Sequence, residues 1–261
     1  MPITPLRASA RARAAIAGVI ALAAAGGGYI TLSTGEKVPP QVVLAMNTLE
    51  PWEETQLRAY LDKLPKPPVW TICAGDTKNV RAGMVETREG CDKRLRTRLI
   101  NDYYKPLTRC IPGFDARPVS WGAMMISLSW NVGVGAACKS TAARLGKEGR
   151  YRESCDAATA FNKAGGKVIR GLVLRREMGD ASRIGEGELC VTGLSMAVAP
   201  PVPAPETAPA AENRPNEPAP PVQPGAEVSS APGYLAAAAI LAAVAAIGFL
   251  IWRRTTKRKR T

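Results

Sequence analysis

Two acidic side chains and a hydroxyl group stand at regular intervals in the segment from Trp52 to Thr77. Glu53 and Asp62 are nine residues apart, and Thr71 follows nine residues later. Two carboxyl groups on opposite sides of a glycosidic bond can hydrolyse it, because one protonates the leaving oxygen while the other activates water or attacks the sugar. The spacing is therefore compatible with glycoside hydrolysis. By itself it fits a solvated acidic surface as well, which is the commoner role of such residues.

The elements around this segment must bring the two acids together. Glu53 and Asp62 cannot share one side of a helix, where neighbours are three or four residues apart. Residues 41–49 have the apolar pattern of a short amphipathic helix, which would deliver Glu53 at its end. Residues 58–86 are rich in Gly, Pro, Thr and Val, and they predict a small irregular sheet that carries Asp62 and Thr71.

The absence of histidine narrows the chemistry. None of the 261 residues is a histidine. Nucleophile systems that depend on histidine, such as Ser-His-Asp and Cys-His, are therefore excluded, and so are hydrolytic zinc sites with histidine ligands. Glycoside hydrolysis by carboxyl groups survives this exclusion, and we expect neither a metal nor a cofactor.

The charge of the chain is concentrated at its ends. The net charge is +13, and nine positive charges flank two apolar segments, as cations flank membrane-spanning helices. These nine are Arg7, Arg11, Arg13, Arg253, Arg254, Lys257, Arg258, Lys259 and Arg260. The other 252 residues carry only +4, which is 13 minus nine. No motif of a nucleic-acid-binding module is present, so we expect no nucleic acid partner.

The residues around the acidic pair resemble the phage-type lysozymes, the muramidase family of phage endolysins. In that family a Glu-Gly pair ends a helix and is followed by Leu-x-Ala-Tyr-x-Asp and Val-Trp-Thr-Ile-Gly-Tyr-Gly-His-Thr. The matching residues here are Leu57, Ala59, Tyr60, Asp62, Val69, Trp70, Thr71, Ile72, Gly75 and Thr77. Further matches, among them residues 130–135, 140–141 and 165–177, extend the resemblance from about Pro40 to Cys190.

The resemblance implies a two-lobed α+β domain, mainly helical with a small β-sheet lobe. It implies a monomeric enzyme that cleaves peptidoglycan at the β-1,4 bond between N-acetylmuramic acid and N-acetylglucosamine. The family's catalytic residues correspond to Glu53, Asp62 and Thr71. Asn131 and Ser140 are candidates for substrate binding, although Asn131 could equally cap the end of a helix.

The sequence departs from the family at three points. Glu54 replaces the glycine that follows the catalytic acid, so Glu50, Glu53 and Glu54 compete for this role, and the spacing back from Tyr60 favours Glu53. Asp76 stands where the family usually has histidine. The loop 63–68 is longer than in the most compact members.

Six cysteines lie between the two apolar segments, and none forms a CxxC pair. Their even number, in a chain with membrane-targeting ends, indicates disulfide bonds in an oxidising compartment. Six buried free thiols are the alternative. The resemblance to cysteine-rich relatives implies sequential pairing, Cys73–Cys91, Cys110–Cys138 and Cys155–Cys190.

Several helices are expected after the sheet. Thr87 is suited to cap a helix that runs to about Thr108, and the resemblance implies that this helix joins the two lobes. An apolar helix is predicted over 118–132, and Gly133 and Gly135 should break it. Shorter helices are expected at about 139–147, 151–163 and 167–180. Arg175 and Arg176 are interpreted as solvated charges on the last of these.

The N-terminal region, residues 1–36, predicts a membrane-targeting segment. Residues 14–35 contain no charge and are rich in Ala and Gly, and they are long enough to span a bilayer as a helix. A cleaved signal peptide, a permanent signal anchor and a signal-arrest-release segment all fit this composition. The lysozyme-like domain is expected to occupy residues 40–192.

The C-terminal region predicts a tether and an anchor. Residues 197–233 are rich in Pro and Ala and should form a disordered linker. Residues 234–252 form an apolar run of transmembrane length, and the basic tail 253–261 marks the cytoplasmic side. We therefore expect N- and C-terminal transmembrane helices in the inner membrane, both termini in the cytoplasm, and the catalytic domain in the periplasm.

Three functions fit these expectations. The first is host cell lysis by a phage endolysin. The second is local wall remodelling by a muramidase of the host envelope, which the C-terminal anchor favours. The third is a wall-binding relative without catalysis, for which Glu54 and Asp76 are the hints.

Overall fold

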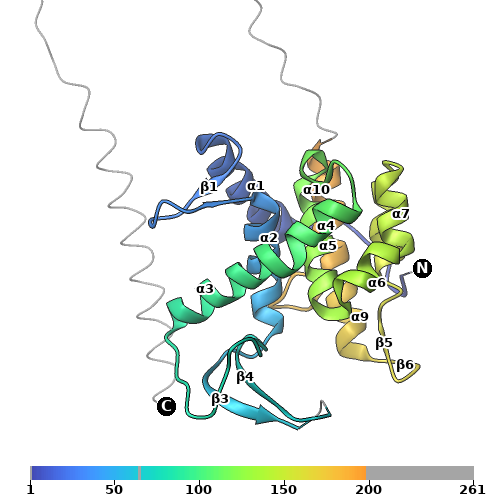
Figure 1. Ribbon diagram of the computed structural model, residues 1–261. Coiled ribbons are helices and arrows are strands. Elements are labelled where there is room, and N and C mark those ends of the chain that lie inside the picture. The colour runs from blue at the N-terminus through green and yellow to red at the C-terminus, as the bar shows by residue number, and fades with distance from the viewer. Residues whose placement is uncertain (1, 64–65, 198–261) are drawn as a thin grey trace, which may run out of the picture. The chain divides into compact units, whose positions relative to one another are not determined.

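The computed structural model of the protein describes residues 2–63 and 66–197. In this part of the chain, helices form one body and a small β lobe lies at one end of it (Figure 1). The expected transmembrane helix 234–252, the basic tail and all but the first residue of the expected linker lie outside the described residues.

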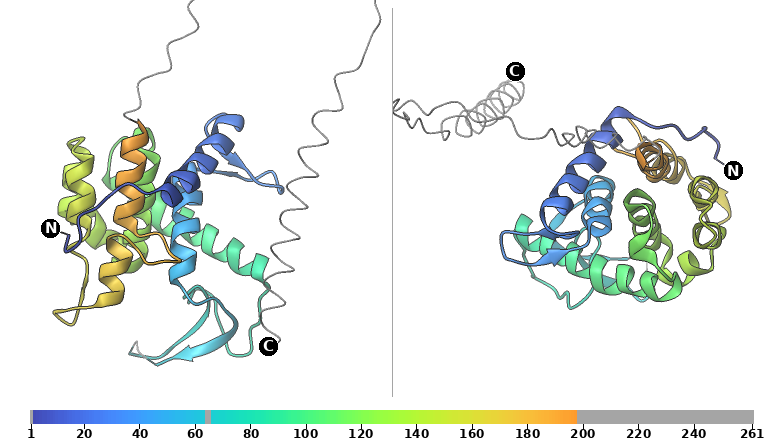
Figure 2. Two further views of the ribbon diagram at one scale, coloured as in Figure 1. Left: turned by 180° about the vertical axis from the view of Figure 1, so that it is seen from behind. Right: turned by 90° about the horizontal axis from the view of Figure 1, so that it is seen from above.

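The helix α5 (Val119–Val132) forms the centre of the core. Its residues 120–129 are all buried, as expected of a helix that is apolar on every side. The helices α2 (Pro40–Leu49) and α10 (Glu186–Ala197) pack against it, and Figure 2 shows α5 from above with other helices around it. The predicted helix 118–132 is therefore confirmed, and it ends at Gly133, whose φ is +83°.

The helix α2 delivers the first candidate acid, as predicted. It begins at a proline, which is favourable at the first position of a helix. Its apolar side chains Val42, Leu44, Ala45 and Leu49 are buried. One short 3₁₀ turn, η1 (Glu50–Trp52), follows, and the backbone becomes extended at Glu53.

The β lobe carries the other two candidates. The strands β3 (Gln56–Asp62) and β4 (Val69–Cys73) pair antiparallel, with Tyr60 opposite Thr71 and an irregularity between Gln56 and Tyr60. Residues 84–86 add backbone hydrogen bonds to β3 on its other side, from Ala59 N to Met84 O and from Glu86 N to Leu57 O. The small irregular sheet predicted over 58–86 is confirmed.

One long helical stretch follows the β lobe. It comprises α3 (Arg88–Arg98), the π-helical turn η2 (Leu99–Tyr104) and α4 (Lys105–Cys110). Thr87 caps it as predicted, because its hydroxyl accepts a hydrogen bond of 3.0 Å from Gly90 N. The stretch ends at Cys110, two residues beyond the predicted end, and the 3₁₀ turn η3 (Phe114–Ala116) leads from it to α5.

The predicted short helices are only partly correct. After α6 (Val134–Lys139), which contains Gly135 instead of breaking there, come α7 (Thr141–Lys147) and α8 (Tyr151–Ala158). The hairpin of β5 (Lys163–Ala164) and β6 (Lys167–Val168) then interrupts the expected helices 151–163 and 167–180. Gly165 and Gly166 both have positive φ, the conformation that a two-residue hairpin turn requires. The helix α9 (Arg170–Arg176) follows the hairpin.

The N-terminal region belongs to the fold. The helix α1 (Ala10–Ala25) packs against α2 and α10, and the short hairpin of β1 (Ile30–Thr31) and β2 (Lys37–Val38) follows it. One side of α1 is buried, through Ala12, Ile16, Val19 and Ala23. The sequence predicted a transmembrane helix here, but among the described residues no helix is long and apolar enough to cross a membrane.

The first eleven residues supply partners for two buried carboxylates. Glu177 accepts hydrogen bonds from the backbone amides of Ile3 and Thr4, at 2.6 and 2.8 Å. Glu188 accepts two from the guanidinium of Arg11, both at 2.8 Å. The bond to Glu188 raises the pKa of Arg11. A buried charge without a partner is costly, so this segment contributes to the stability of the domain.

All six cysteines are paired. The disulfides are Cys73–Cys91, Cys110–Cys138 and Cys155–Cys190, which is the pairing that the resemblance implied. They join β4 to α3, α4 to α6, and α8 to α10. The alternative of six free thiols is wrong.

Candidate active site

The three predicted catalytic residues occupy neighbouring elements. Glu53 follows η1, and 23% of its side chain is exposed. Asp62 is the last residue of β3 and is half-buried, and Thr71 is buried on β4. The Thr71 hydroxyl donates a hydrogen bond of 3.4 Å to the carbonyl of Val69, which is paired with Asp62 in the sheet. The sheet therefore fixes Asp62 and Thr71 relative to each other.

Tyr60 connects the sheet to the first acid. Partial burial raises the pKa of its phenol, and the negative charges of Asp62, Glu54 and Glu53 raise it further. Glu53 lies three residues before β3 begins, and Asp62 is the last residue of that strand.

The three competing acids differ in their surroundings. Glu50 forms an ion pair with Arg88 at the start of α3. Glu54 is exposed. Glu53 pairs with Arg175, with 2.8 Å between Glu53 Oε1 and Arg175 Nη1. Of the three acids, Glu53 is therefore the one that contacts α9, and its role as the general acid stays a prediction.

The contact with Glu53 is one end of a buried ionic cluster. Only 7% of the Arg175 side chain is exposed, and its Nε lies 3.4 Å from Oε1 of Glu186. Glu186 also pairs with Arg176, which donates to the side chain of Asn131. The expectation that Arg175 and Arg176 are solvated is therefore wrong, since both are buried.

The predicted substrate-binding residues hold structural contacts. Asn131 is exposed near the end of α5, and its side-chain oxygen accepts the bond from Arg176. Ser140 is the N-cap of α7, and its hydroxyl accepts a bond of 3.0 Å from Ala143 N and donates one of 2.7 Å to Ala137 O. A role for either residue in substrate binding stays a prediction.

Trp52, the residue before Glu53, also contacts the C-terminal part of the domain. The indole nitrogen of Trp52 donates a hydrogen bond of 3.0 Å to the carbonyl of Ile184. The guanidinium of Arg183 lies 3.9 Å from the centre of the Trp52 ring, within the range of a cation–π interaction. The loop between α9 and α10 thus fixes η1 from one side.

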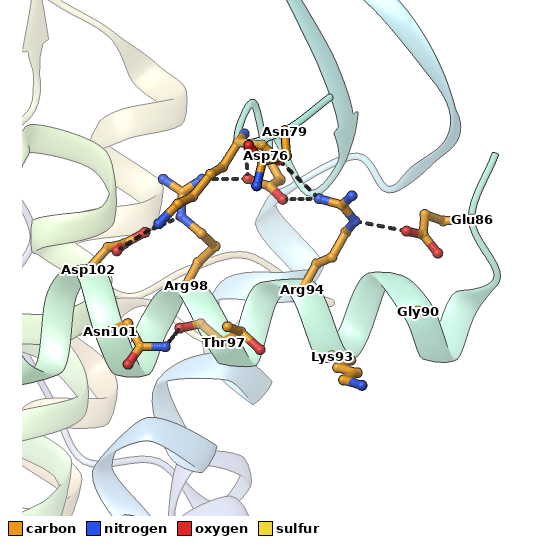
Figure 3. A pocket seen from close by; sticks show the side chains of 11 residues that line it. Asp76, Asn79, Glu86, Gly90, Lys93, Arg94, Thr97, Arg98, Asn101 and Asp102 are labelled. Carbon is orange, nitrogen blue, oxygen red and sulfur yellow. Dashed lines mark hydrogen bonds and ion pairs between the residues drawn. The ribbon is translucent and has the colours of Figure 1, made fainter. Parts of the chain in front are cut away.

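Asp76 joins the β lobe to α3. Its buried carboxylate, 4% exposed, pairs with Arg98 and, at 2.7 Å, with Arg94 (Figure 3). Arg94 also pairs with Glu86, and Arg98 with Asp102. A cavity of about 520 Å³ adjoins this ionic network. Its lining residues include Asp76, Arg94 and Arg98 but none of the three predicted catalytic residues.

Replacing Asp76 tests this joint. Asp76→Asn leaves two guanidinium groups short of one anion, and we expect the free energy of unfolding to fall by about 2–3 kcal/mol. Asp76→His restores the residue usual in the resembled family but faces two arginines, so it should destabilise more than Asn. Urea unfolding of both variants measures the effect, and a histidine variant as stable as the original protein would contradict it.

Some contacts of the site were not predicted from the sequence. Arg175 and Glu186 are eleven residues apart, and only the turn between α9 and α10 brings them together. The adjacent pair Arg175-Arg176 in an apolar helix could have indicated a buried ionic contact, because an arginine that is buried there requires an anionic partner. In the described part of the chain, no group of three acidic or cysteine side chains could hold a metal ion.

Comparison with known proteins identifies the class of this site. The model of the phage lysozyme family matches residues 50–179. The chain is 35% identical to the SAR-endolysin of Enterobacteria phage P21 over 132 residues, which are 48% of this chain and 70% of the relative. It is 34% identical to the SAR-endolysin of Enterobacteria phage PA-2, again over 132 residues that are 48% of this chain and 70% of the relative. The protein is therefore a glycoside hydrolase of the lysozyme class.

The solved structure of the muramidase domain of SpmX from Asticaccaulis excentricus is also similar. It is 25% identical, covers 57% of this chain and 95% of its own, and aligns with a TM-score of 0.47. On the sequence relatives, this chain belongs to the phage lysozyme family.

Proposed function

We propose that the protein hydrolyses the β-1,4 bond between N-acetylmuramic acid and N-acetylglucosamine in peptidoglycan. The observation that supports the proposal is the position of Glu53 directly after η1, partly buried, paired with Arg175 and followed by the strand pair β3–β4 that carries Asp62 and Thr71. Glu53 is the general acid that protonates the glycosidic oxygen. Asp62 stabilises the positive charge that develops on the sugar or orients the attacking water, and Thr71 helps to place that water.

The products of a wall digest test the bond and the reaction type. Purified peptidoglycan is incubated with the full chain and the fragments are analysed by mass spectrometry. Hydrolysis at the proposed bond gives fragments that end in reducing N-acetylmuramic acid. Reducing N-acetylglucosamine ends would refute the proposed bond, and anhydro ends would refute hydrolysis by water. Intact wall in the presence of folded protein would favour the wall-binding relative without catalysis.

The proposed role is host cell lysis, and the two SAR-endolysin relatives support it. The same relatives support a membrane-associated, secreted protein. In our proposal the catalytic domain lies in the periplasm, and residues 234–252 attach it to the inner membrane. Local wall remodelling in the host envelope is the second candidate, favoured by the apolar run 234–252 that precedes a basic tail. Expression confined to the time of lysis would support the first candidate, and constitutive expression the second.

Export also provides a means of control. We propose that the enzyme reaches full activity only after its three disulfides form outside the cytoplasm. Cys73–Cys91 joins β4, which carries Thr71, to α3, so the geometry of the site depends on it. Full chain purified with all thiols reduced should be less active than the oxidised form, and equal activity would refute this control.

The disulfide between α8 and α10 should contribute most to stability. Cys155 and Cys190 are 35 residues apart, the longest of the three separations. In the chain-entropy model, closing a loop of this length stabilises the fold by about 3–4 kcal/mol. Replacing both cysteines by alanine should lower the free energy of unfolding by this amount in urea titration. An unchanged midpoint would contradict the expectation.

A further inference from the structure

The buried carboxylate of Glu186 has no part in the proposed catalytic trio, yet it is connected to it. Glu186 is the first residue of α10 and is 1% exposed. It contacts Arg175 Nε at 3.4 Å and Arg176 Nη1, and it accepts a hydrogen bond of 2.6 Å from the hydroxyl of Ser127. The N-terminus of a helix also favours a negative charge at this position. The carboxylate of Glu186 is therefore enclosed by two arginines and a hydroxyl donor.

The charges of the four ionic side chains indicate how Glu186 affects Glu53. Arg175 and Arg176 carry two positive charges, and Glu53 and Glu186 carry two negative charges when both are ionised. A general acid must hold its proton before it can give it away, and a protonated Glu53 leaves Glu186 alone to balance both arginines. Without Glu186, the arginines would have only Glu53 as counter-ion, and they would favour its ionised form.

We propose that Glu186 is a positioning residue for the reaction: by engaging Arg175 and Arg176, it allows Glu53 to keep the proton that it donates to the substrate. This inference rests on the proposed function of Glu53 as the acid. Arg175 transmits the effect, since it contacts Glu53 through Nη1 and Glu186 through Nε. Its Nη2 is buried without a hydrogen-bond partner among the described residues, so these two carboxylates are its ionic partners in the site.

The other charges near Glu53 belong to the β lobe and the segment before it. Tyr60 is within electrostatic range of Glu53, and Asp62 and Glu54 act on the same phenol. Asp62 and Glu54 are acidic side chains, so neither can replace Arg175 as a cationic partner of Glu53. Among the described residues, Arg175 is the cation that forms an ion pair with Glu53, so the other partners of Arg175 act on the acid through it.

The variant Glu186→Gln tests the inference through the pH dependence of wall lysis. The rate falls at high pH as the acid loses its proton. Removing the anion should move this alkaline limb to lower pH by about one unit. The rate above the limb then falls about tenfold, because one unit changes the protonated fraction tenfold. A uniform loss of rate without a shift would show a merely structural role and overturn the inference.

The variant Arg176→Gln should shift the alkaline limb in the opposite direction. It removes one positive charge and leaves the contact between Arg175 and Glu53 in place, so the alkaline limb should move to higher pH. A structural defect has no reason to produce shifts in opposite directions. Where Glu186→Gln does not fold, the direction in Arg176→Gln decides, and a shift to lower pH or no shift overturns the inference.

Glu188→Gln is the matched control. Glu188 lies on the same helix and is equally buried, but its partner is Arg11. We expect this variant to lose stability in urea and to keep the alkaline limb of the original protein. A limb displaced as far as in Glu186→Gln would mean that any buried acid of α10 has the effect, and it would overturn the specific role of Glu186.

The failure of this inference can be told apart from the failure of the proposed function. If Glu53→Gln remains active, Glu53 is not the acid and the proposed function fails. If Glu53→Gln is inactive while neither Glu186→Gln nor Arg176→Gln shifts the profile, the proposed function stands and Glu186 is structural.

Discussion

Glu53→Gln is expected to abolish lysis of purified cell wall while the protein stays folded. Glutamine keeps the shape of the side chain and can still contact Arg175, but it has no acidic proton to give to the glycosidic oxygen. Loss of general acid catalysis alone costs about 10²–10⁴-fold in rate. The decrease in turbidity of a wall suspension measures the rate, and circular dichroism with urea unfolding measures the fold.

The neighbouring acids provide the controls for this experiment. Glu54→Gln changes an exposed side chain of the same type one position away, and it should retain most of the activity. Glu50→Gln breaks the ion pair with Arg88 and should act on stability more than on rate. If Glu54→Gln or Glu50→Gln abolished lysis and Glu53→Gln did not, the acid would have been assigned to the wrong residue.

Removing residues 1–25 is expected to unfold the domain or to lower its free energy of unfolding by more than about 5 kcal/mol. The truncation exposes the apolar surfaces of α2 and α10 that α1 covers. It also takes Arg11 from Glu188, and the amides of Ile3 and Thr4 from Glu177. Leaving one buried charge unpaired costs about 3–5 kcal/mol by itself. Differential scanning calorimetry of the full and the shortened chain measures the effect.

Two substitutions in α1 test whether the buried side of this helix stabilises the domain. Ile16 is buried and Leu22 is exposed. Ile16→Ala should destabilise by about 2–4 kcal/mol, whereas Leu22→Ala should stay within about 0.5 kcal/mol. A shortened chain that melts as cooperatively as the full chain, together with a neutral Ile16→Ala, would show that α1 does not contribute to the fold.

The elements with a strong local signal were predictable from the sequence. The helix over 119–132 is apolar on every side. Thr87 is a residue type that commonly caps helices, and it indicates the start of α3. The hairpin at Gly165 and Gly166 was missed because each of its strands has only two residues, too few to show an alternating pattern. Gly135 lies within α6, the helix that the disulfide Cys110–Cys138 joins to α4; tertiary bonds of this kind can override a low helix propensity.

Some features of the candidate site were likewise predictable from the sequence, and others were not. Glu53, Asp62 and Thr71 were proposed from the sequence because their spacing and neighbours match a family, and their catalytic roles stay a prediction. The role of α1 was not predicted, because an Ala- and Gly-rich apolar run suits a bilayer and a close contact between helices equally well. The cluster of Arg175, Arg176 and Glu186 arises from tertiary packing, and in the sequence Glu186 is only an acid in the first turn of a helix, where acids are common.

The arginine pairs around Asp76 and Glu186 have a consequence for how the enzyme can be studied. Arginine keeps its charge at every pH at which proteins are assayed, and the chain contains no histidine, the side chain that ordinarily titrates near neutrality. Its cysteines are locked in disulfides. A titration of lysis across the neutral range would thus be free of the background that imidazoles and thiols contribute in other enzymes.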